Sequence, residues 1–407
     1  ETYIYQWGDF KPLDKWIAEI ETLLVKYPKL PSPEIEAKVT AGVFTALMYR
    51  QPQHPHLPIW TERLHRLIEF SPDASLSMML GNHLLLYYTW WSGDLAKGAN
   101  LVNMLEPLSR IPDLAPLSRI AWHAIKAAHC WMTGDNAGCI QAIEEGLKIA
   151  ESTGVHVWDF MLLAQGVWGV LTFGEIDKAA SMFKRMLLVM DNNRLLDVCH
   201  YRYQAFIEAM HRNDASQMME HAEAALRLAR EAGVIWAEGI VLPAVARAYM
   251  SSGKYDEAAK INKQAMQIAQ DIRSKTIEAG TLQAETEFAM EQGNESACIQ
   301  ALQKTFTVDR QQGFINTSWW RSSVMSRLCA RALEYDIEVE YVQALIKKRR
   351  LLPPDDTPSI DAWPFPVKLY TLGRFSALVD DKPLNFSGKS QKKPIELLKA
   401  LIAFGGR

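Results

Sequence analysis

Long apolar runs and paired cysteines are both missing from this sequence. No stretch of about 18 consecutive apolar residues could span a membrane, and the first residues, ETYIYQWGDF, lack the basic and apolar regions of a secretion signal. We therefore expect no membrane partner. The five cysteines contain no C-x-x-C pair, which argues against the common zinc and redox motifs and favours reduced thiols in the cytoplasm.

Signals of catalysis are also scarce. Gly388-Lys389-Ser390 resembles the end of a phosphate-binding loop, but the required first glycine is replaced by Pro383, which has no N–H to offer a phosphate. No nucleophile–base pair or acidic pair has a convincing spacing. His54 and His56 could bind a metal, but prolines flank them and no third ligand stands nearby in the sequence, so we interpret them as loop residues. We expect no enzyme, no cofactor and no metal.

Charge is almost balanced over the whole chain but not along it. The net charge is −3 over 407 residues. Residues 367–407 hold eight basic and three acidic side chains, a charge of +5, so residues 1–366 carry −8. A short basic end on a long acidic body suggests two separate tasks, one of them at a polyanion such as DNA.

Turn residues recur at a fixed period through most of the chain. One series has successive spacings of 41, 40, 39, 40 and 40 residues: Gly93, Gly134, Gly174, Asn213, Gly253 and Gly293. A second series is interleaved about twenty residues away: Gly154, Asn193, Gly233, Arg273 and Gly313. Glycine and asparagine tolerate the left-handed conformation that ends helices. The pattern therefore predicts a helical repeat of about 40 residues.

The segments between these turns have helical periodicity. In KYDEAAKINKQAMQIAQ, apolar residues recur at three- and four-residue steps and form one stripe. Small residues such as Gly98, Cys139 and Ala258 stand five positions after the first-series turns, where they allow paired helices to approach closely. We predict an all-α superhelix of helix–turn–helix units, with Cys130, Cys139 and Cys298 as buried thiols.

The best unit, from Leu242 to Ala269, resembles the tetratricopeptide repeat (TPR). The resemblance is carried by Ala246, Tyr249, Gly253, Tyr255, Ala258 and Ala265. A period of about 40 instead of the family's 34 implies longer helices, as in the sensor domains of MalT-like bacterial transcription activators. The resemblance covers nearly all of residues 1–350 and implies a larger parent protein, often with a nucleotide-hydrolysing switch domain before the repeats.

The last part of the chain follows a different pattern. LLPPDDTPSIDAWPFP, at 351–366, is too rich in proline for a helix and is typical of a semi-rigid linker. VKLYTLGRFSALVDDKPLNF then predicts short antiparallel strands with Asp380-Asp381-Lys382-Pro383 as the turn. SQKKPIELLKALIAFGG predicts one amphipathic helix that ends at Gly405-Gly406.

These features resemble the beginning of an OmpR-type winged-helix domain, as in bacterial transcription activators of the SARP class. The resemblance rests on Leu372-Gly373-Arg374-Phe375 and on the helix from Pro394 to Arg407. It implies three parts: a TPR-like sensor at 1–350, a linker at 351–366 and a truncated DNA-binding domain at 367–407. Lys389, Lys392 and Lys393 are its candidates for contact with the DNA backbone.

Positions expected to face the concave groove of the superhelix carry aromatic and charged residues. The candidates for this groove are Tyr87, Trp90, Trp131, Trp168, Tyr203, Arg247, Glu287 and Arg327. For any single aromatic residue, packing between helices is the favoured interpretation. As a set, these side chains could hold a small metabolite or a peptide.

Two hypotheses for function follow. In the first, the superhelix senses a small-molecule inducer or a protein partner and controls DNA binding by a complete C-terminal domain. In the second, the repeats are a scaffold that binds a partner's helix or peptide. Under either hypothesis the protein could form homo-oligomers.

Overall fold

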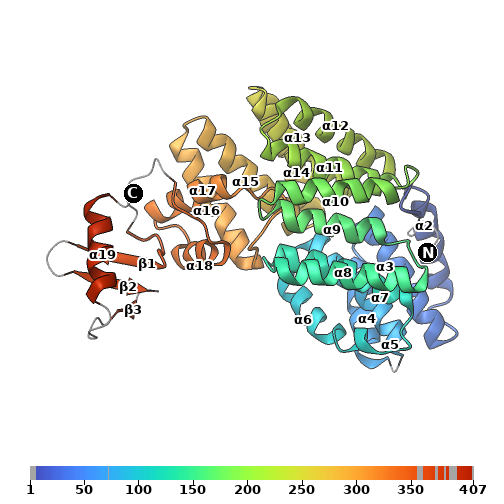
Figure 1. The fold of residues 1–407 in the computed structure, drawn as a ribbon. Coiled ribbons are helices and arrows are strands. Elements are labelled where there is room, and N and C mark those ends of the chain that lie inside the picture. The colour runs from blue at the N-terminus through green and yellow to red at the C-terminus, as the bar shows by residue number, and fades with distance from the viewer. Residues whose placement is uncertain are drawn as a thin grey trace. The chain divides into compact units, whose positions relative to one another are not determined.

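The structure, a computed structural model, describes residues 6–71, 73–354, 361–371, 375–379, 382–384 and 392–405. The chain divides into two compact units, Glu1–Pro358 and Ser359–Arg407. Each unit is described by itself below, and Figure 1 labels their elements. Within the described ranges, no helix is both long and apolar enough to cross a membrane.

The first unit begins with a set of helices that precede the regular repeats. They are α2 (Leu13–Lys26), α3 (Pro33–Arg50), α4 (Leu57–Phe70), α5 (Ala74–Leu86), the π-helix η1 (Tyr87–Ser92), α6 (Leu95–Leu105) and the 3-10 helix η2 (Leu108–Arg110). Side-chain caps begin several of them, as when Asp73 accepts the N–H groups of Ser75 and Leu76. The π-helix was not expected from the sequence.

Regular helix pairs follow and stack on one another (Figure 1). The inner helices are α7 (Pro116–Met132), α9 (Asp159–Leu171), α11 (Leu195–His211), α13 (Ile235–Ser251) and α15 (Lys275–Glu291). The outer helices are α8 (Asn136–Thr153), α10 (Ile176–Val189), α12 (Ala215–Ala232), α14 (Tyr255–Asp271) and α16 (Glu295–Gln312). In α9 every residue from Phe160 to Leu171 is buried, whereas α10 buries only three. Inner helices are thus covered on all sides, and outer helices are amphipathic.

The predicted turns determine where these helices end. Every member of the first series has a positive φ, from 56° at Asn213 to 79° at Gly174. In the second series Gly154, Gly233, Arg273 and Gly313 do so too, which confirms the 40-residue repeat. The prediction for Asn193 is wrong, because α10 already ends at Val189 and Asn193 instead bonds to Asp191.

The repeat is interrupted after α16. Residues 314–321, here called the crossing loop, are not helical, although the period predicts a new helix there. Asn316 in this loop donates hydrogen bonds to the Trp131 carbonyl and to Thr172 Oγ1, both at 2.8 Å. The loop therefore spans the interior of the superhelix before α17 (Ser322–Glu334) and α18 (Val339–Arg349) complete the unit.

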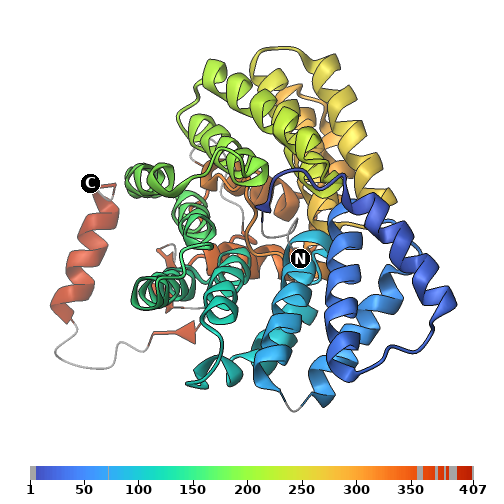
Figure 2. The ribbon, with the colours of Figure 1, turned by 90° about the vertical axis from the view of Figure 1, so that its right-hand side faces the viewer.

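The N-terminal segment, residues 6–12, also crosses the interior. The Trp7 carbonyl accepts the N–H of Leu196 at 3.1 Å, and the Phe10 N–H donates to the Ala232 carbonyl at 2.9 Å. Phe10 also stacks on Tyr49 of α3, with ring centroids 4.6 Å apart. Figure 2 shows this segment (dark blue) between the N-terminal helices and the middle of the repeat array. The superhelix is thereby closed on itself.

The second unit is a three-stranded antiparallel sheet and one helix. Strands β1 (Val367–Tyr370), β2 (Ser376–Val379) and β3 (Lys382–Pro383) lie in the order β1-β2-β3, and α19 (Lys392–Ala403) follows. Val367 pairs with Val379, and Leu378 pairs with Pro383. The antiparallel strands and the helix are as predicted, but Lys382 and Pro383 belong to a strand and not to the turn.

Candidate ligand chamber

Aromatic side chains enclose a cavity inside the first unit, here called the aromatic chamber. The space between its lining atoms is about 890 Å³, including the part open to solvent. Its walls come from the N-terminal segment, α3, η1, the inner helices and the crossing loop. The ring-bearing residues among them are Trp7, Tyr49, Trp90, Trp91, Trp131, Trp168, His200, Tyr203, Trp236, Phe314 and Trp319. Mainly aromatic walls with a few polar atoms are typical of a small-molecule site.

Stacked indoles make one wall rigid. Trp236 stacks on Trp91 and on Trp90, with centroids 4.5 and 5.6 Å apart, and its Nε1 donates to the Trp90 carbonyl at 2.7 Å. Trp131 and Trp168 form a second stacked pair, with ring centroids 5.6 Å apart. Both Trp131 and Trp168 are held by further hydrogen bonds, to Gln165 Oε1 at 2.9 Å and to His200 Nε2 at 2.6 Å. The flat walls are therefore preorganised.

The chamber contains few polar atoms, and some of them have no partner. Burial lowers the pKa of His200 to about 3, so its ring is neutral and accepts the Trp168 N–H. Tyr203 bonds to Ser318 at 3.0 Å. Among the described residues, by contrast, Trp91 Nε1, Trp319 Nε1 and Asn316 Oδ1 are buried without a hydrogen-bond partner. Such atoms in a chamber wall can bind the polar groups of a ligand.

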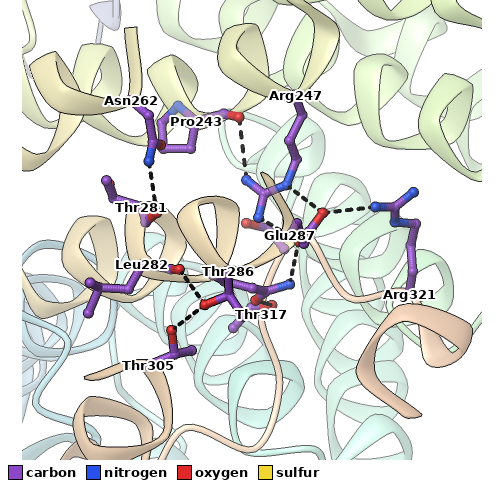
Figure 3. Close-up of polar contacts among 12 residues, drawn as sticks. Pro243, Arg247, Asn262, Thr281, Leu282, Thr286, Glu287, Thr305, Thr317 and Arg321 are labelled. Carbon is purple, nitrogen blue, oxygen red and sulfur yellow. Dashed lines mark hydrogen bonds and ion pairs between the residues drawn. The ribbon is translucent and has the colours of Figure 1, made fainter. Parts of the chain in front are cut away.

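A cluster of charged side chains is formed by Arg247, Glu287 and Arg321 (Figure 3). Arg247 Nη2 donates to Glu287 Oε1 at 2.9 Å, and Arg321 Nη2 donates to Glu287 Oε2 at 2.9 Å. The side chains of Arg247 and Glu287 are 1% and 2% exposed. Burial alone would raise the pKa of Glu287, but Arg247 and Arg321 outweigh it and hold this pKa below its usual value. Arg247 also lies over the Trp319 ring, 5.4 Å from its centroid.

Behind the crossing loop, α18 is connected to the end of α9. Arg349 Nη2 donates to the Thr172 carbonyl at 2.5 Å. Its guanidinium lies between Phe173 and Trp320, 4.1 and 4.0 Å from their centroids, and burial lowers its pKa to about 9. Arg349 is thus a partly buried packing residue at the end of α18.

The structure brings together only part of the predicted groove set. Trp90, Trp131, Trp168 and Tyr203 line the chamber. The other members lie elsewhere, as follows. Tyr87 packs edge-on against Phe44, Arg247 and Glu287 neutralise each other, and Arg327 faces Glu291 at 3.7 Å with 45% of its side chain exposed.

Several chamber residues were missed by the sequence reasoning. Trp91 and Trp236 belong to repeat helices, and their aromatic character beside a groove position was the available signal. Trp7 and Trp319 come from the N-terminal segment and the crossing loop, which lie outside the periodic pattern. No local signal places those two inside the superhelix.

The remaining predicted residues are placed as follows. Cys130, Cys139 and Cys298 are buried, as predicted, and so are Cys199 and Cys329. Lys393 is exposed on α19, whereas Lys389 and the side chain of Lys392 lie outside what the structure describes. Gly388-Lys389-Ser390, Asp380-Asp381 and Leu372-Gly373-Arg374 also lie outside it. For His54 and His56 the structure adds a third candidate ligand, Glu21, which is distant in the sequence but approaches both.

Comparisons with known proteins agree with the repeat fold. No family model matches the sequence. No curated protein matches it either. Among solved structures, a Rap protein complexed with competence and sporulation factor is similar, with a TM-score of 0.54 and 11% identity over 78% of this chain and 88% of that one. Apo RapI (TM-score 0.40, 9% identity, 77% and 85% covered) and a monomeric IFIT1 mutant with m7Gppp-AAAA (0.47, 12%, 83% and 73%) are more distant.

At 11% identity the Rap likeness shows the fold alone. Together with the paired helices and the 40-residue turns, it identifies the first unit as a TPR-like superhelix.

Proposed function

We propose that the TPR-like unit is the signal-receiving part of a bacterial transcription regulator and that the aromatic chamber is its ligand site. The observation that carries the proposal is the chamber itself. Indoles from segments as far apart as Trp7 and Trp319 converge on one cavity. Protein interiors are otherwise close-packed, so a space left open between these rings suits a ligand.

The chamber chemistry favours an uncharged, flat molecule. Its walls are aromatic faces, and two ion pairs buried beside them, Arg247–Glu287 and Arg194–Asp197, are each paired internally. The N–H groups of Trp91 and Trp319 would donate to carbonyl or ether oxygens of the ligand, and Asn316 Oδ1 would accept one N–H or O–H. A charged ligand would lose its hydration without gaining a counter-ion.

Thr172 would couple ligand binding in the chamber to α18. Its Oγ1 accepts from the chamber residue Asn316, and its carbonyl accepts from Arg349 of α18. Since α18 is the last helix before the C-terminal unit, a ligand that moves Asn316 would change the end of the superhelix from which that unit continues. This is a population shift between two packings of the crossing loop.

The C-terminal unit would serve DNA binding as the beginning of a winged-helix domain. Its antiparallel sheet followed by one helix has the element order that this resemblance requires. Lys389, which precedes α19 in the sequence, and Lys392 and Lys393, at the start of α19, would contact phosphates, and base-reading residues would be supplied by a complete domain.

A thermal-shift assay with small aromatic probes tests the ligand site. Indole, coumarin and quinolin-2-one represent uncharged bicyclic ligands, and tryptamine and indole-3-acetate are their charged counterparts. A ligand that binds only the folded state raises Tm. We expect a rise with the uncharged set and none with the charged set. The absence of a shift with all uncharged probes at millimolar concentration would count against the chamber as a ligand site.

The alternative is a scaffold that binds a partner's helix or peptide. It is favoured by the similar Rap protein, whose solved complex contains competence and sporulation factor. The closure of the superhelix by the N-terminal segment and the crossing loop argues for the small ligand, because a helix could enter only after both had left. Stabilisation by a random amphipathic-peptide library, with no effect of the aromatic probes, would select the scaffold.

A further inference from the structure

Three metal-ligating side chains from two distant parts of the sequence meet on the surface of the first unit. Glu21 lies on α2, and His54 and His56 lie on the turn between α3 and α4. Their ligating atoms all lie within 4.8 Å of one another. Glu21 Oε1 is 3.3 Å from His54 Nε2 and 3.3 Å from His56 Nδ1. No other such group occurs among the described residues.

These distances fit the corners of a metal tetrahedron. Zinc binds imidazole nitrogen and carboxylate oxygen at about 2.0–2.2 Å, so two ligands in a tetrahedral site are about 3.3–3.5 Å apart. In the structure the contact from His56 Nδ1 to Glu21 is a long hydrogen bond, weaker than one at the usual length of about 2.9 Å. One carboxylate oxygen facing two imidazoles at a separation near that of tetrahedral ligands could exchange this weak contact for bonds to a shared cation.

The backbone on both sides of the cluster is held in place. Pro52 and Pro55 restrict the turn, and its carbonyls at Gln51 and His54 accept N–H groups three residues on, at 2.8 and 3.1 Å. Helix α2 is fastened to the same turn, because Asp14 Oδ1 accepts from Arg50 Nε and Gln51 Nε2, both at 3.1 Å. The three ligands are thus brought together by interactions that do not depend on a metal.

We propose that Glu21, His54 and His56 bind a divalent transition-metal ion, for which zinc is the best fit, with water in the fourth position. Two imidazoles disfavour magnesium and calcium, which prefer oxygen ligands. The ion would fasten α2 to the α3–α4 turn. Since α2 continues directly from the N-terminal segment that carries Trp7, the metal would also stabilise the closed superhelix.

Binding requires both imidazoles to give up the ring proton that faces Glu21. His56 Nδ1 donates to Glu21 Oε1 at 3.3 Å, so a metal on this nitrogen would move its proton through solvent to Nε2. His54 Nδ1 accepts the backbone N–H of His56 at 3.2 Å, so in this state the ring proton is on Nε2, facing Glu21. A metal on Nε2 would displace that proton, which returns through solvent to Nδ1, and the weak 3.2 Å contact would give way. The net proton count of a neutral imidazole does not change.

The test is zinc binding to the full chain without an affinity tag, measured by calorimetry and by thermal shift, with Mg²⁺ as the comparison ion. We expect one zinc per chain and a higher Tm with Zn²⁺ but not with Mg²⁺. His54→Ala, His56→Ala and Glu21→Gln should each weaken zinc binding at least about tenfold, since loss of an outer-shell partner alone costs 10–100-fold. His156→Ala is the matched control, because His156 lies 2.8 Å from Asp159 but belongs to no group of three.

Cobalt supplies a measurement that needs no variant. Co²⁺ bound to two imidazoles and a carboxylate in four-coordinate geometry gives strong visible absorption, which zinc should abolish by competition. The proposal is overturned if zinc does not bind stoichiometrically, if His156→Ala weakens binding as much as His54→Ala, or if bound Co²⁺ shows only the weak spectrum of a six-coordinate ion. None of these results depends on the aromatic chamber.

Discussion

Asn316 donates a hydrogen bond to Thr172 across 2.8 Å, although the two residues are 144 positions apart in the sequence. Asn316 belongs to the crossing loop and lines the aromatic chamber, whereas Thr172 ends α9 and also accepts Arg349 through its carbonyl. One residue therefore connects the chamber to the last helix of the repeat unit. Coupling between two sites requires such an element with two alternative arrangements.

The variant Thr172→Val tests this connection. It removes the hydroxyl that accepts Asn316 but keeps the carbonyl and the side-chain volume. We expect it to lower the free energy of unfolding by about 1–3 kcal/mol, because the Asn316 amide loses a buried partner. A chamber ligand should still bind, but its effect on amide hydrogen exchange in residues 339–349 should disappear.

Thr133→Val is the matched control for that experiment. Thr133 follows α7 in the same way as Thr172 follows α9. The Thr133 hydroxyl donates to the His129 carbonyl at 2.8 Å, and the Thr172 hydroxyl donates to the Trp168 carbonyl at the same distance. No bond from the crossing loop to the Thr133 hydroxyl is present in the described structure. If both variants changed exchange at α18 equally, the route through Thr172 would be wrong.

The buried pair Arg247–Glu287 predicts a large effect on stability. Glu287→Gln leaves two arginines without their carboxylate, and we expect it to lower the free energy of unfolding by about 3–5 kcal/mol. The double variant Arg247→Met/Glu287→Leu should lose less, because no buried charge of this pair remains. Urea denaturation measures both.

An exposed pair is the control for that comparison. Arg227 and Glu231 approach only to 4.0 Å, with side chains 71% and 52% exposed. Glu231→Gln should change the unfolding free energy by less than about 1 kcal/mol. If Glu287→Gln lowered the unfolding free energy by no more than Glu231→Gln, the buried charged cluster would not stabilise the fold as predicted.

Buried histidines predict that stability declines in weak acid. Burial lowers the pKa of His200 to about 3 and that of His129 to about 4, whereas unfolded histidine has a pKa near 6.5. The unfolded chain therefore binds more protons between pH 4 and 6.5. Stability should be fully present above about pH 6.5 and fall as the pH drops toward 4.

His200→Gln measures one part of this pH dependence. Removing one buried histidine should reduce the slope of unfolding free energy against pH by up to about 1.4 kcal/mol per pH unit. A slope that is the same for wild type and His200→Gln would contradict the buried, neutral state of His200.

Binding of this chain to duplex DNA should be weak and without sequence preference. The basic C-terminal segment offers phosphate contacts, whose affinity falls steeply with salt. Replacing Lys389, Lys392 and Lys393 by glutamate should abolish the binding seen in a mobility-shift assay at low salt. Lys260→Glu/Lys263→Glu on α14 is the control, and tight, sequence-specific binding by residues 1–407 would contradict the prediction.

The sequence predicted the repeat because the turns are local. Gly93, Gly174 and Gly253 need a left-handed backbone, and glycine there is visible at once. It also predicted the groove residues that share one face of the inner helices, such as Trp131 and Trp168, because helical periodicity determines that face.

What the sequence could not reveal depends on closure of the superhelix. Trp7 and Trp319 enter the chamber only because two non-periodic segments cross the interior, and no local pattern encodes those contacts. The pairing of Arg247 with Glu287 and the approach of Glu21 to His54 likewise follow from packing between repeats. The helical periodicity of the sequence does not predict these contacts between distant residues.

The central claim is that the aromatic chamber binds an uncharged flat molecule, and tryptophan fluorescence measures it most directly. The most stabilising of the aromatic probes is titrated into the wild type, into Ala279→Phe, which fills the chamber, and into Ala137→Phe, which adds the same ring at an exposed site. We predict saturable quenching in the wild type and in Ala137→Phe, and at least about tenfold weaker binding in Ala279→Phe. Equal affinity in all three proteins would contradict the claim.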